Sequence, residues 1–269
     1  MSVMNQNESA INLKGVQKKY GEFEALKSID LDIYPGEFFG FLGPNGAGKT
    51  TLIRIITGII KPSAGIIKIG GFDLISEPEK AKIKMGYIPD RPYLYEKLTP
   101  VEYFEFVGTL YSIPQSEILQ RGEEMLKLFS LWDWRGELIE SYSHGMKQKV
   151  AMCSSLLHDP DIIVVDEPMI GLDPKSVRLV KDFFKKLVNR GKTVFLTTHT
   201  LSVAEDLCSR IAIINHGSVV ALGSMDELRN IAQDPGKDLE SIFLKITEEE
   251  DEHGAFMLTS PSTPPASVV

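Results

Sequence analysis

One stretch of this sequence restricts the possible folds of the chain more than any other. It runs from Gly43 to Thr50, reads Gly-Pro-Asn-Gly-Ala-Gly-Lys-Thr, and has the spacing of a phosphate-binding loop. Its glycines let backbone N–H groups turn inward and place no side chain in the way of a phosphate group. The apolar run from Phe38 to Leu42 predicts a buried strand before the loop, and apolar residues recur on one helical face after it. The sequence therefore predicts an α/β fold that binds phosphate at a helix N-terminus, rather than a glycine-rich turn that only connects two elements.

Length, charge and cysteine content limit the function classes. A chain of 269 residues fits one large α/β domain, or a core with a subdomain. The formal net charge of −8 opposes a general nucleic-acid-binding surface, although it leaves room for a local basic patch. The two cysteines, Cys153 and Cys208, lack metal-ligand spacing and are expected to be buried, reduced thiols. Reduced thiols suit a cytosolic protein.

The sequence has no segment of about 18–20 uninterrupted apolar residues, the length that a membrane-spanning helix needs. Residues 1–10 are polar and lack the basic and apolar regions of a signal peptide. We therefore expect a soluble, cytoplasmic protein that meets a membrane only through a partner.

Hydrophobic patterning divides the chain into an α/β core and an inserted helical layer. Alternating apolar residues from Ile11 to Ile33 predict two strands ahead of the phosphate-binding loop. Between Thr99 and His158 the apolar residues recur at helical spacings instead. The α/β pattern then returns with an apolar strand that ends at Asp166, and the turn residues 215–217 predict a hairpin.

Residues 248–269 differ in composition from the rest of the chain. They combine an acidic run from Glu248 to Glu252 with an end rich in serine and proline. Such a composition cannot form a packed core, so we expect a disordered, solvated tail. A surface that pairs with a basic partner is the alternative.

Two adjacent carboxylates, Asp166 and Glu167, end the apolar strand that begins at Ile162. In phosphate-loop ATPases an acidic residue at such a strand end holds the Mg²⁺ shell, which makes Asp166 the candidate, together with the Thr50 hydroxyl. Glu167 is then placed to accept a proton from an attacking water molecule. A solvated strand end without chemistry is the alternative.

A third motif indicates the family. Residues 141–149 read Ser-Tyr-Ser-His-Gly-Met-Lys-Gln-Lys and resemble the signature motif of ATP-binding-cassette (ABC) proteins. Other motifs of that family occur in the same order. Gly43 to Thr50 matches the Walker A loop, residues 171–173 (Gly-Leu-Asp) match the D-loop, and His199 matches the H-loop histidine. The resemblance covers about residues 11–247.

The resemblance implies a P-loop NTPase (RecA-like) α/β core with an N-terminal antiparallel β subdomain and an α-helical signature subdomain inserted at about residues 91–160. Residues 1–247 would then form one ABC ATPase nucleotide-binding domain that uses ATP and Mg²⁺. In this family the signature motif closes on ATP held by the Walker A loop of another protomer. The resemblance therefore also implies a second ATPase subunit, either a copy of this chain or a paralogue.

The motifs and the resemblance together give the candidate site residues. Those expected to bind ATP are Tyr20, as an adenine-stacking aromatic, and Gly43, Pro44, Asn45, Gly46, Ala47, Gly48, Lys49, Thr50 and Thr51. Those expected to face the ATP of the opposite protomer are Ser143, His144, Gly145 and Met146, with Asp173 in the D-loop. The expected catalytic residues are Lys49, Glu167 and His199, and the expected metal ligands are Thr50, Asp90 and Asp166. His144 enters only as a member of its motif, because nothing else in its context indicates chemistry.

Two departures from the commonest family pattern carry information. The signature begins Tyr-Ser-His-Gly-Met at Tyr142, where many members have Leu-Ser-Gly-Gly-Gln, and this variant resembles the ABC-2 type exporters. Asp90 stands at the Q-loop position, where glutamine is usual. We expect Asp90 to sense nucleotide and to move residues 91–98 against a membrane partner. Its charge would either strengthen magnesium binding or raise the proton affinity of a nearby carboxylate such as Glu167, and a loop aspartate without a metal role is the alternative.

These features predict the ATPase subunit of an ABC transporter, peripheral on the inner face of the cell membrane, which powers a separate transmembrane permease and serves export. The rival function is a soluble ABC ATPase that acts on nucleic acid or ribosomes. Such proteins typically carry two cassettes or a long coiled-coil insert, and this sequence has neither. The acidic balance also disfavours nucleic acid as a partner.

Overall fold

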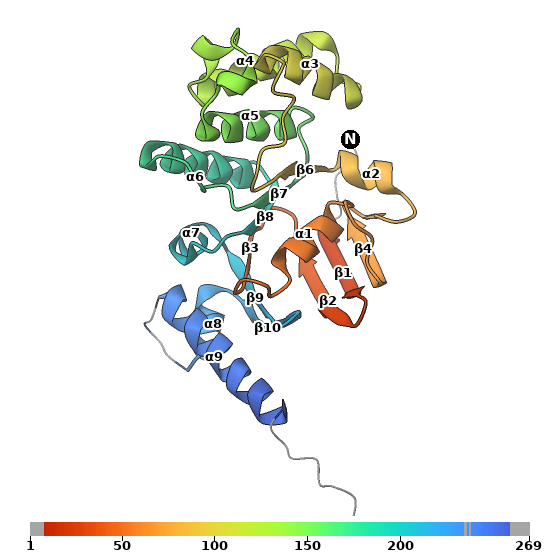
Figure 1. The fold of residues 1–269 in the computed structure, drawn as a ribbon, viewed down its shortest axis with the longest axis vertical. Coiled ribbons are helices and arrows are strands. Elements are labelled where there is room, and N and C mark those ends of the chain that lie inside the picture. Colours follow the sequence, from red (N-terminus) through yellow and green to blue (C-terminus); the bar gives the residue numbers. More distant parts are fainter. Residues whose placement is uncertain (1–7, 234–235, 237, 259–269) are drawn as a thin grey trace, which may run out of the picture.

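The structure, a computed structural model, describes residues 8–233, 236 and 238–258. Two β-sheets carry the fold (Figure 1), a small one with strand order β2-β1-β4-β5 and a large one with order β10-β9-β3-β8-β7-β6. The strands of the small sheet are β1 (Ile11–Tyr20), β2 (Phe23–Ile33), β4 (Ala64–Ile69) and β5 (Phe72–Asp73). The strands of the large sheet are β3 (Phe38–Leu42), β6 (Met85–Ile88), β7 (Ile162–Asp166), β8 (Thr193–Thr197), β9 (Arg210–Asn215) and β10 (Ser218–Gly223).

The small sheet is antiparallel throughout and forms the predicted N-terminal β subdomain. β1 lies between β2 and β4, with Ile11 opposite both Ile33 and Ile69. The close approach of β4 to β1 requires Gly65, since its φ is +97° and an added Cβ would lie 2.4 Å from the Gly15 carbonyl oxygen. β4 is therefore held tightly against β1, and the sheet that they form carries the entrance of the site described below.

The large sheet is parallel from β9 to β6, and only β10 pairs in the antiparallel direction. Every residue of β3, β7 and β8 is buried, which explains why these strands are continuous apolar runs rather than alternating ones. Because the strands are parallel, β3, β7 and β8 all have their carboxyl ends on the same side of the sheet. β6 is the edge strand, and Pro89 directly follows it.

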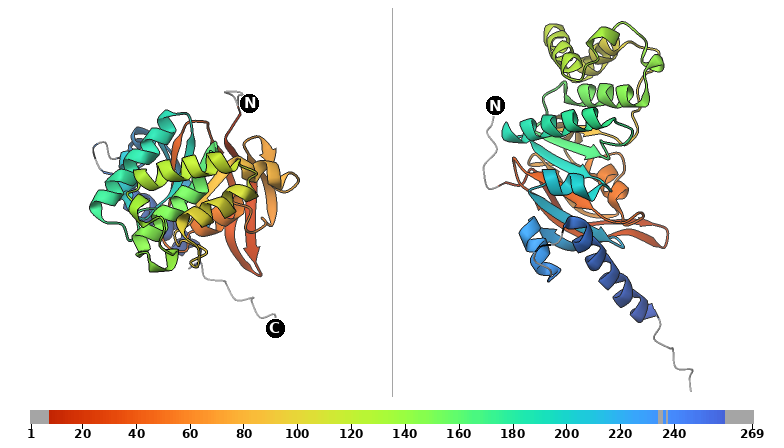
Figure 2. Two further views of the ribbon diagram at one scale, coloured as in Figure 1. Left: turned by 90° about the horizontal axis from the view of Figure 1, so that it is seen from above. Right: turned by 90° about the vertical axis from the view of Figure 1, so that its left-hand side faces the viewer.

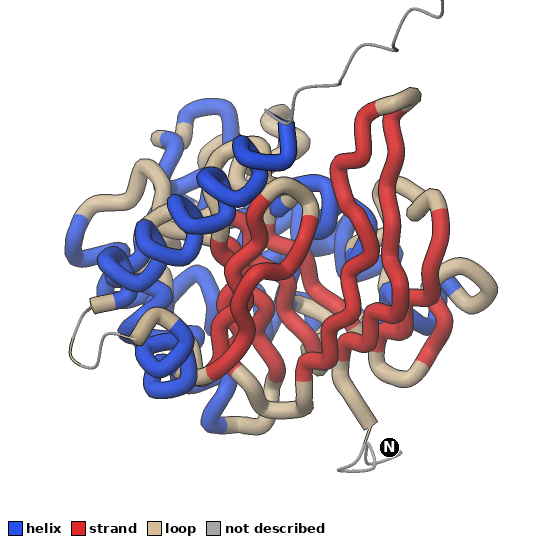
Figure 3. Tube along the Cα trace, turned by 90° about the horizontal axis from the view of Figure 1, so that it is seen from below, coloured by secondary structure: helices blue, strands red, loops and turns tan. Residues whose placement is uncertain are grey.

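Helices cover both faces of the large sheet (Figures 1 and 3). On one face, helix α1 (Lys49–Ile56) lies between the two sheets and buries Leu52, Ile53, Ile55 and Ile56 in a core shared with β1, β2 and β4. On the other face, α6 (Pro174–Asn189) and α7 (Leu201–Leu207) contribute to a second core. The predicted P-loop NTPase core is confirmed by this arrangement.

The predicted helical layer is also confirmed. It consists of α3 (Pro100–Leu110), α4 (Gln115–Leu128), the short 3₁₀ turns η1 (Trp132–Trp134) and η2 (Ile139–Ser141), and α5 (His144–Leu156). Thr99 caps α3, because its side chain accepts from the Glu102 N–H while the Glu102 side chain accepts from the Thr99 N–H. Figure 2 shows that these helices stand at one end of the molecule, beyond α6. Helix α2 (Pro78–Ile83) leads into β6 on the core side.

The C-terminal segment departs from one sequence-based expectation. The predicted hairpin of β9 and β10 is present and is followed by α8 (Met225–Ile231). Helix α9 then runs from Leu239 to Leu258, so the acidic run that begins at Glu248 is helical rather than disordered. Glutamate favours helix, and the packed first half of α9, with Leu239 and Ile242 buried, provides the nucleus from which the helix continues. Residues 259–269, the rest of the predicted tail, lie outside the described residues.

Among the described residues, no helix combines the length and the apolar character that are needed to cross a bilayer.

Candidate functional site

The loop from Gly43 to Gly48 joins buried strand β3 to helix α1, as the sequence predicts. A Cβ at Gly43 would lie 2.3 Å from the Ile214 carbonyl oxygen, and one at Gly48 would lie 2.8 Å from the Ala25 carbonyl oxygen. Gly46 and Gly48 also have φ values of +82° and +115°. Glycine is therefore required at these positions by packing and by conformation. The result is a loop whose backbone leads directly into the N-terminus of a helix, where an anion is favoured.

Lys49 begins α1 and folds back over the loop. Its Nζ donates to the carbonyl oxygens of Gly43 at 2.5 Å and Pro44 at 3.0 Å. Burial lowers the pKa of this ammonium, while the nearby Glu167 and Asp166 carboxylates act in the opposite direction. The lysine is thus a positive charge already aimed at the space that the loop surrounds.

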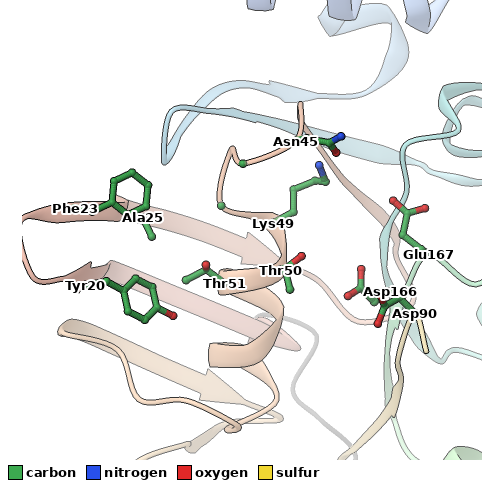
Figure 4. Close-up of a pocket in the computed structure, with 12 residues that line it drawn as sticks. Tyr20, Phe23, Ala25, Asn45, Lys49, Thr50, Thr51, Asp90, Asp166 and Glu167 are labelled. Carbon is green, nitrogen blue, oxygen red and sulfur yellow. The ribbon is translucent and has the colours of Figure 1, made fainter. Parts of the chain in front are cut away.

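The loop borders a cavity of about 440 Å³ that brings together most of the predicted site (Figure 4). In the figure, Lys49 and Thr50 stand on one side of it, and Asp90, Asp166 and Glu167 stand on the other. The predicted residues among its lining are Tyr20, Asn45, Gly46, Gly48, Lys49, Thr50, Thr51, Asp90, Asp166 and Glu167. Phe23 and Ala25 also line the cavity, and sequence reasoning missed them.

Asp166, the last residue of β7, is only 7% exposed, and its Oδ1 accepts a 2.6 Å hydrogen bond from the Thr197 hydroxyl on β8. Burial raises the pKa of Asp166, and the negative charges of Asp90 and Glu167 raise it further, against the effects of Thr197 and Lys49. A nearby cation would stabilise the ionised form of such a carboxylate. With the Thr50 hydroxyl across the cavity, it offers the hard oxygen ligands that Mg²⁺ prefers.

Glu167 has a backbone conformation that its sequence does not reveal. Its φ is +48°, which is uncommon for a residue with a side chain. The Glu167 N–H is held by the Thr197 carbonyl oxygen at 3.0 Å, which fixes the residue in this conformation. Backbone strain of this kind concentrates at functional sites, where it aims a side chain.

His199 and Glu167, each expected from the sequence to be catalytic, lie in contact. The His199 Nδ1 lies 3.0 Å from the Glu167 Oε2. A carboxylate oxygen accepts, so this contact is a hydrogen bond when Nδ1 carries a proton. The His199 side chain is 61% exposed and that of Glu167 only 15% exposed, so the histidine forms the outer side of the pair. One Glu167 oxygen is thus held by His199, and the other remains to accept a proton.

Asp90 acts on a nearby carboxylate, as one of the alternatives from the sequence states, and that carboxylate is Asp166. Burial and, to a lesser degree, the negative charge of Asp90 raise the pKa of Asp166, while burial, Asp166 and Asp90, in that order, raise the pKa of the Tyr87 hydroxyl. In Figure 4 the Asp90 side chain lies next to Asp166. Asp90 therefore increases the negative charge at the candidate metal ligand.

This repulsion predicts how stability depends on pH in nucleotide-free protein without metal. Because the pKa of Asp166 is raised on folding, the folded state binds its proton more tightly than the unfolded state, and that stabilisation is lost as pH rises through the folded pKa. Asp90→Asn is therefore expected to raise the unfolding midpoint at neutral pH by about 2–4 °C for each kcal/mol of repulsion removed. The difference should shrink as the pH falls through the raised pKa of Asp166, because a protonated Asp166 carries no charge for Asp90 to repel.

Thermal unfolding followed by circular dichroism at several pH values checks this expectation. Asp133→Asn is the matched control, because Asp133 is exposed and lies in the helical layer, away from the cavity. An Asp90→Asn midpoint that is unchanged or lower at neutral pH would contradict the electrostatic account.

The aromatic side of the cavity is exposed. Tyr20 and Phe23 face each other across the end of the β1–β2 hairpin and are 50% and 63% exposed. The Lys18 Nζ lies 5.1 Å from the centre of the Tyr20 ring. Exposed rings at the mouth of a phosphate site provide a surface on which a planar base can stack.

The predicted signature residues lie elsewhere. Ser143 caps α5, with its Oγ accepting from the Met146 N–H, and a Cβ on Gly171 would lie 2.6 Å from the His144 ring. Asp173 caps α6 by accepting from the Lys175 and Ser176 N–H groups, and the hydrogen bonds from Ser176 keep the Asp173 pKa below its usual value. Of the described residues, neither Asp173 nor the four signature residues line the cavity around Lys49.

Comparison with known proteins agrees with this geometry. A family model described as ABC transporter matches residues 26–170, more than half of the chain. The chain belongs to the ABC transporter family. It is similar to a solved ATP-binding subunit of an ABC transporter, with a TM-score of 0.85 and 30% identity over 89% of this chain and all of that one. It also resembles the dimeric ATP-binding cassette MJ0796 bound to ADP and Pi, with a TM-score of 0.73 and 31% identity over 80% and 98% of the two chains.

Relatives in sequence point to the same class of cassette. An ABC transporter ATP-binding protein of Nostoc is 44% identical over 76% of this chain, which spans 61% of that protein. The linearmycin resistance ATP-binding protein LnrL of Bacillus subtilis is 36% identical over 81% of this chain and 70% of its own length. NatA of the same organism is 35% identical over 85% of this chain and 92% of its own length. The predicted resemblance to exporter ATPases is confirmed, and the chain is an ATP-binding, ATP-hydrolysing ABC transporter subunit.

Proposed function

We propose that this cassette hydrolyses MgATP in a two-chain sandwich on the inner face of the cell membrane and drives export through a separately encoded permease. The observation that carries the proposal is the facing arrangement of two groups across one cavity. Lys49 and Thr50 begin α1 on one side, while Asp166, the end of β7, and the His199-bound Glu167 that follows it stand on the other. Phosphoryl transfer to water uses a cation that holds the phosphates, a carboxylate that holds the metal ion and a second carboxylate that positions the attacking water. Lys49, Asp166 and Glu167 are placed for these three roles.

The residues divide this work by position. The loop from Gly43 to Gly48 and Lys49 would hold the phosphates, Thr51 would add a hydroxyl near them, and Tyr20 would stack on the adenine. Thr50 and Asp166 would hold Mg²⁺, which when bound neutralises phosphate charge. Asp90, beside Asp166, would increase the affinity for that cation. Lys49 meets the remaining negative charge that develops on the transferred group.

Glu167 acts as the general base in this proposal. Its free oxygen accepts a proton from water as the oxygen of water attacks the terminal phosphorus. The bond from that phosphorus to the bridging oxygen breaks, and ADP leaves with the electron pair. His199 holds the other carboxylate oxygen, so the base has one orientation. Such a positioned base contributes about 10²–10⁴ in rate.

The position of the signature supports a dimer. Ser143 and the first N–H groups of α5 form an anion site of their own, at the start of a helix of 13 residues. Since this site does not line the Lys49 cavity of its own chain, it would serve the nucleotide of a second subunit, with Asp173 nearby. The dimeric state of the MJ0796 cassette supports the same arrangement.

An exposed aromatic surface next to Asp90 supports the permease partner. Tyr93 and Tyr95 are 82% and 61% exposed, and Phe106 on α3 is 42% exposed and packs edge-on against Tyr95. Residues 95–98 and Phe106 surround a cavity of about 330 Å³. Large apolar side chains gathered at one exposed place mark an interaction site. We propose that the segment 91–98 meets the permease here and transmits the state of Asp90 to it.

Purification of the tagged chain from solubilised native membranes tests this function. A multi-span membrane protein should co-purify in stoichiometric amount, and Tyr95→Asp should reduce its recovery at least about tenfold, because a buried charge without a partner is costly. Tyr34→Asp is the control, since Tyr34 is 45% exposed on the side of the β2–β3 turn. Recovery of ribosomal or other soluble proteins alone would leave the ATPase chemistry intact and would overturn the transport proposal.

A further inference from the structure

Gln148 is a buried polar residue on α5 that the nucleotide chemistry does not use. It is 1% exposed, and its Nε2 donates a 2.9 Å hydrogen bond to the Pro89 carbonyl oxygen. Pro89 immediately precedes Asp90, and Ser143, at the start of the same helix, is the residue proposed to face the second nucleotide. The Gln148 side chain therefore joins the segment that carries Asp90, beside the Lys49 cavity, to the helix that begins next to Ser143.

The Gln148 amide has only one orientation that fits. The Pro89 carbonyl oxygen is an acceptor, so the NH₂ group must face it, and a flipped amide would set two oxygens against each other. In this orientation the Oε1 is buried and has no hydrogen-bond partner among the described residues. A buried acceptor left unpaired is unfavourable for stability and offsets part of what the hydrogen bond to the Pro89 carbonyl oxygen contributes. The net contribution of Gln148 to stability is therefore small, whereas its hydrogen bond fixes the Pro89 carbonyl group relative to α5.

Two further contacts show that α5 lies along the whole segment that carries Asp90. The Ser155 hydroxyl donates to the Tyr87 carbonyl oxygen at 2.6 Å, and the Lys147 ammonium lies 2.7 Å from Glu96. β6 is the edge strand of the large sheet, so it pairs with β7 on one side only. A Cβ at Gly86 would lie 2.4 Å from the Ser155 carbonyl oxygen, which shows how closely α5 approaches β6.

We propose that Gln148 is a positioning residue that couples the Asp90 loop to α5, so that nucleotide at the Lys49 cavity places Ser143 for the second subunit. Of the three contacts, the Gln148 hydrogen bond is the one next to Asp90, and its donor side chain is buried. The Lys147 pair is exposed on the Glu96 side, where its effect is screened by solvent. Gln148 thus transmits displacement of the loop along a rigid helix to its N-terminal end. This inference rests on the proposed role of Ser143.

Hydrogen exchange of the single chain tests the coupling without requiring a dimer. The protein is held at low concentration, where sedimentation shows it to be monomeric, with and without Mg²⁺ and a non-hydrolysable ATP analogue. In the unaltered chain, amides of residues 88–94 and of residues 144–150 should both exchange more slowly with nucleotide. Gln148→Met keeps the side-chain volume but cannot donate a hydrogen bond. We call the slowing of exchange by nucleotide the response of a segment. In this variant the response of residues 88–94 should remain, and the response of residues 144–150 should fall at least about threefold.

Ser154→Ala is the matched control, because Ser154 is a buried polar residue on the same helix whose hydroxyl donates to Ala151 within α5. It should leave both responses unchanged. Equal responses in Gln148→Met and the unaltered chain would overturn the proposal, as would an unaltered chain in which 144–150 does not respond to nucleotide. Failure of the proposed sandwich would look different, since ATP would then not dimerise the chain at high concentration although both segments respond.

Gln148→Glu gives a second test, which separates a coupling role of the hydrogen bond from a role of Gln148 in packing alone. An ionised carboxylate opposite the Pro89 carbonyl oxygen cannot donate, whereas a protonated one can, and burial raises the pKa of such a group. The 144–150 response of this variant should be lost at alkaline pH and regained as the pH falls, while that of Gln148→Met stays low throughout. A Gln148→Glu response that does not vary with pH would contradict the role of the hydrogen bond.

Discussion

Glu167→Gln is expected to bind ATP with the affinity of the unaltered chain and to lose turnover by about 10²–10⁴-fold. Glutamine keeps the size of the side chain and can still meet His199 Nδ1 with its amide oxygen, so the geometry of the pair survives. What it lacks is the second oxygen that accepts a proton from water. Binding and chemistry should therefore separate in this variant, and ATP should accumulate in the closed dimer because it is no longer consumed.

Steady-state phosphate release and sedimentation with MgATP measure the two effects. Glu79→Gln is the control, since Glu79 is exposed in the first turn of α2 and far from the base. It should match the unaltered chain in both measurements. Turnover by Glu167→Gln at the parent rate would remove Glu167 from the chemistry, and a monomer at saturating ATP would refute the two-chain sandwich.

Much of the site could be predicted because its parts are encoded locally. The loop from Gly43 to Thr50 is short, and its glycines are required by contacts of the loop itself and by φ values that other residues rarely adopt. The apolar run that ends at Asp166 is buried on both sides, so its identity as a central strand follows from composition. The cap of α5 by Ser143 also depends on neighbouring residues only.

The contacts that orient these parts could not be predicted, because they depend on strand register. Thr197 meets Asp166 since β7 and β8 pair with these two residues opposite each other, and a register shifted by one residue would turn Thr197 away. The positive φ of Glu167 follows from the Thr197 carbonyl that holds its N–H. The Gln148 bond to Pro89 likewise joins residues 59 positions apart. Only the packing of the helical layer against β6 brings them together.

The sequence-based expectation was wrong for the second half of α9, because it considered only the composition of residues 248–269 and not the helix that precedes them. An acidic run followed by residues rich in serine and proline cannot form a packed core, which is the basis of the expectation for residues 248–269. Within the chain it follows a helix that is already anchored by Leu239, Ile242 and Ile246. Extending an existing helix costs far less than starting one, and glutamate has a good helix propensity.

Lys49→Met is expected to abolish most nucleotide binding while leaving the fold intact. The Lys49 pKa is lowered by burial, so below that pKa the charged side chain destabilises the fold, and its removal relieves that cost at neutral pH. The variant also loses the two hydrogen bonds to the Gly43 and Pro44 carbonyl oxygens, which acts in the opposite direction. These effects offset each other, and the nucleotide-free unfolding midpoint should stay within about 4 °C of the parent.

Binding has no such compensation, because methionine offers no charge to phosphate oxygens in a site that Asp90, Asp166 and Glu167 make negative. A ligand at about 100 times its Kd stabilises the folded state by about 2.7 kcal/mol, which for the parent should raise the midpoint by about 5–10 °C with MgATP. A loss of about 100-fold in affinity reduces that shift to roughly 1–2 °C in Lys49→Met at the same ATP concentration. Lys80→Met, which removes an exposed lysine paired with Glu77, should keep the full shift. A full shift in Lys49→Met would mean that the loop amides and the helix N-terminus hold the phosphates without the lysine, and that its charge is used only in the transition state.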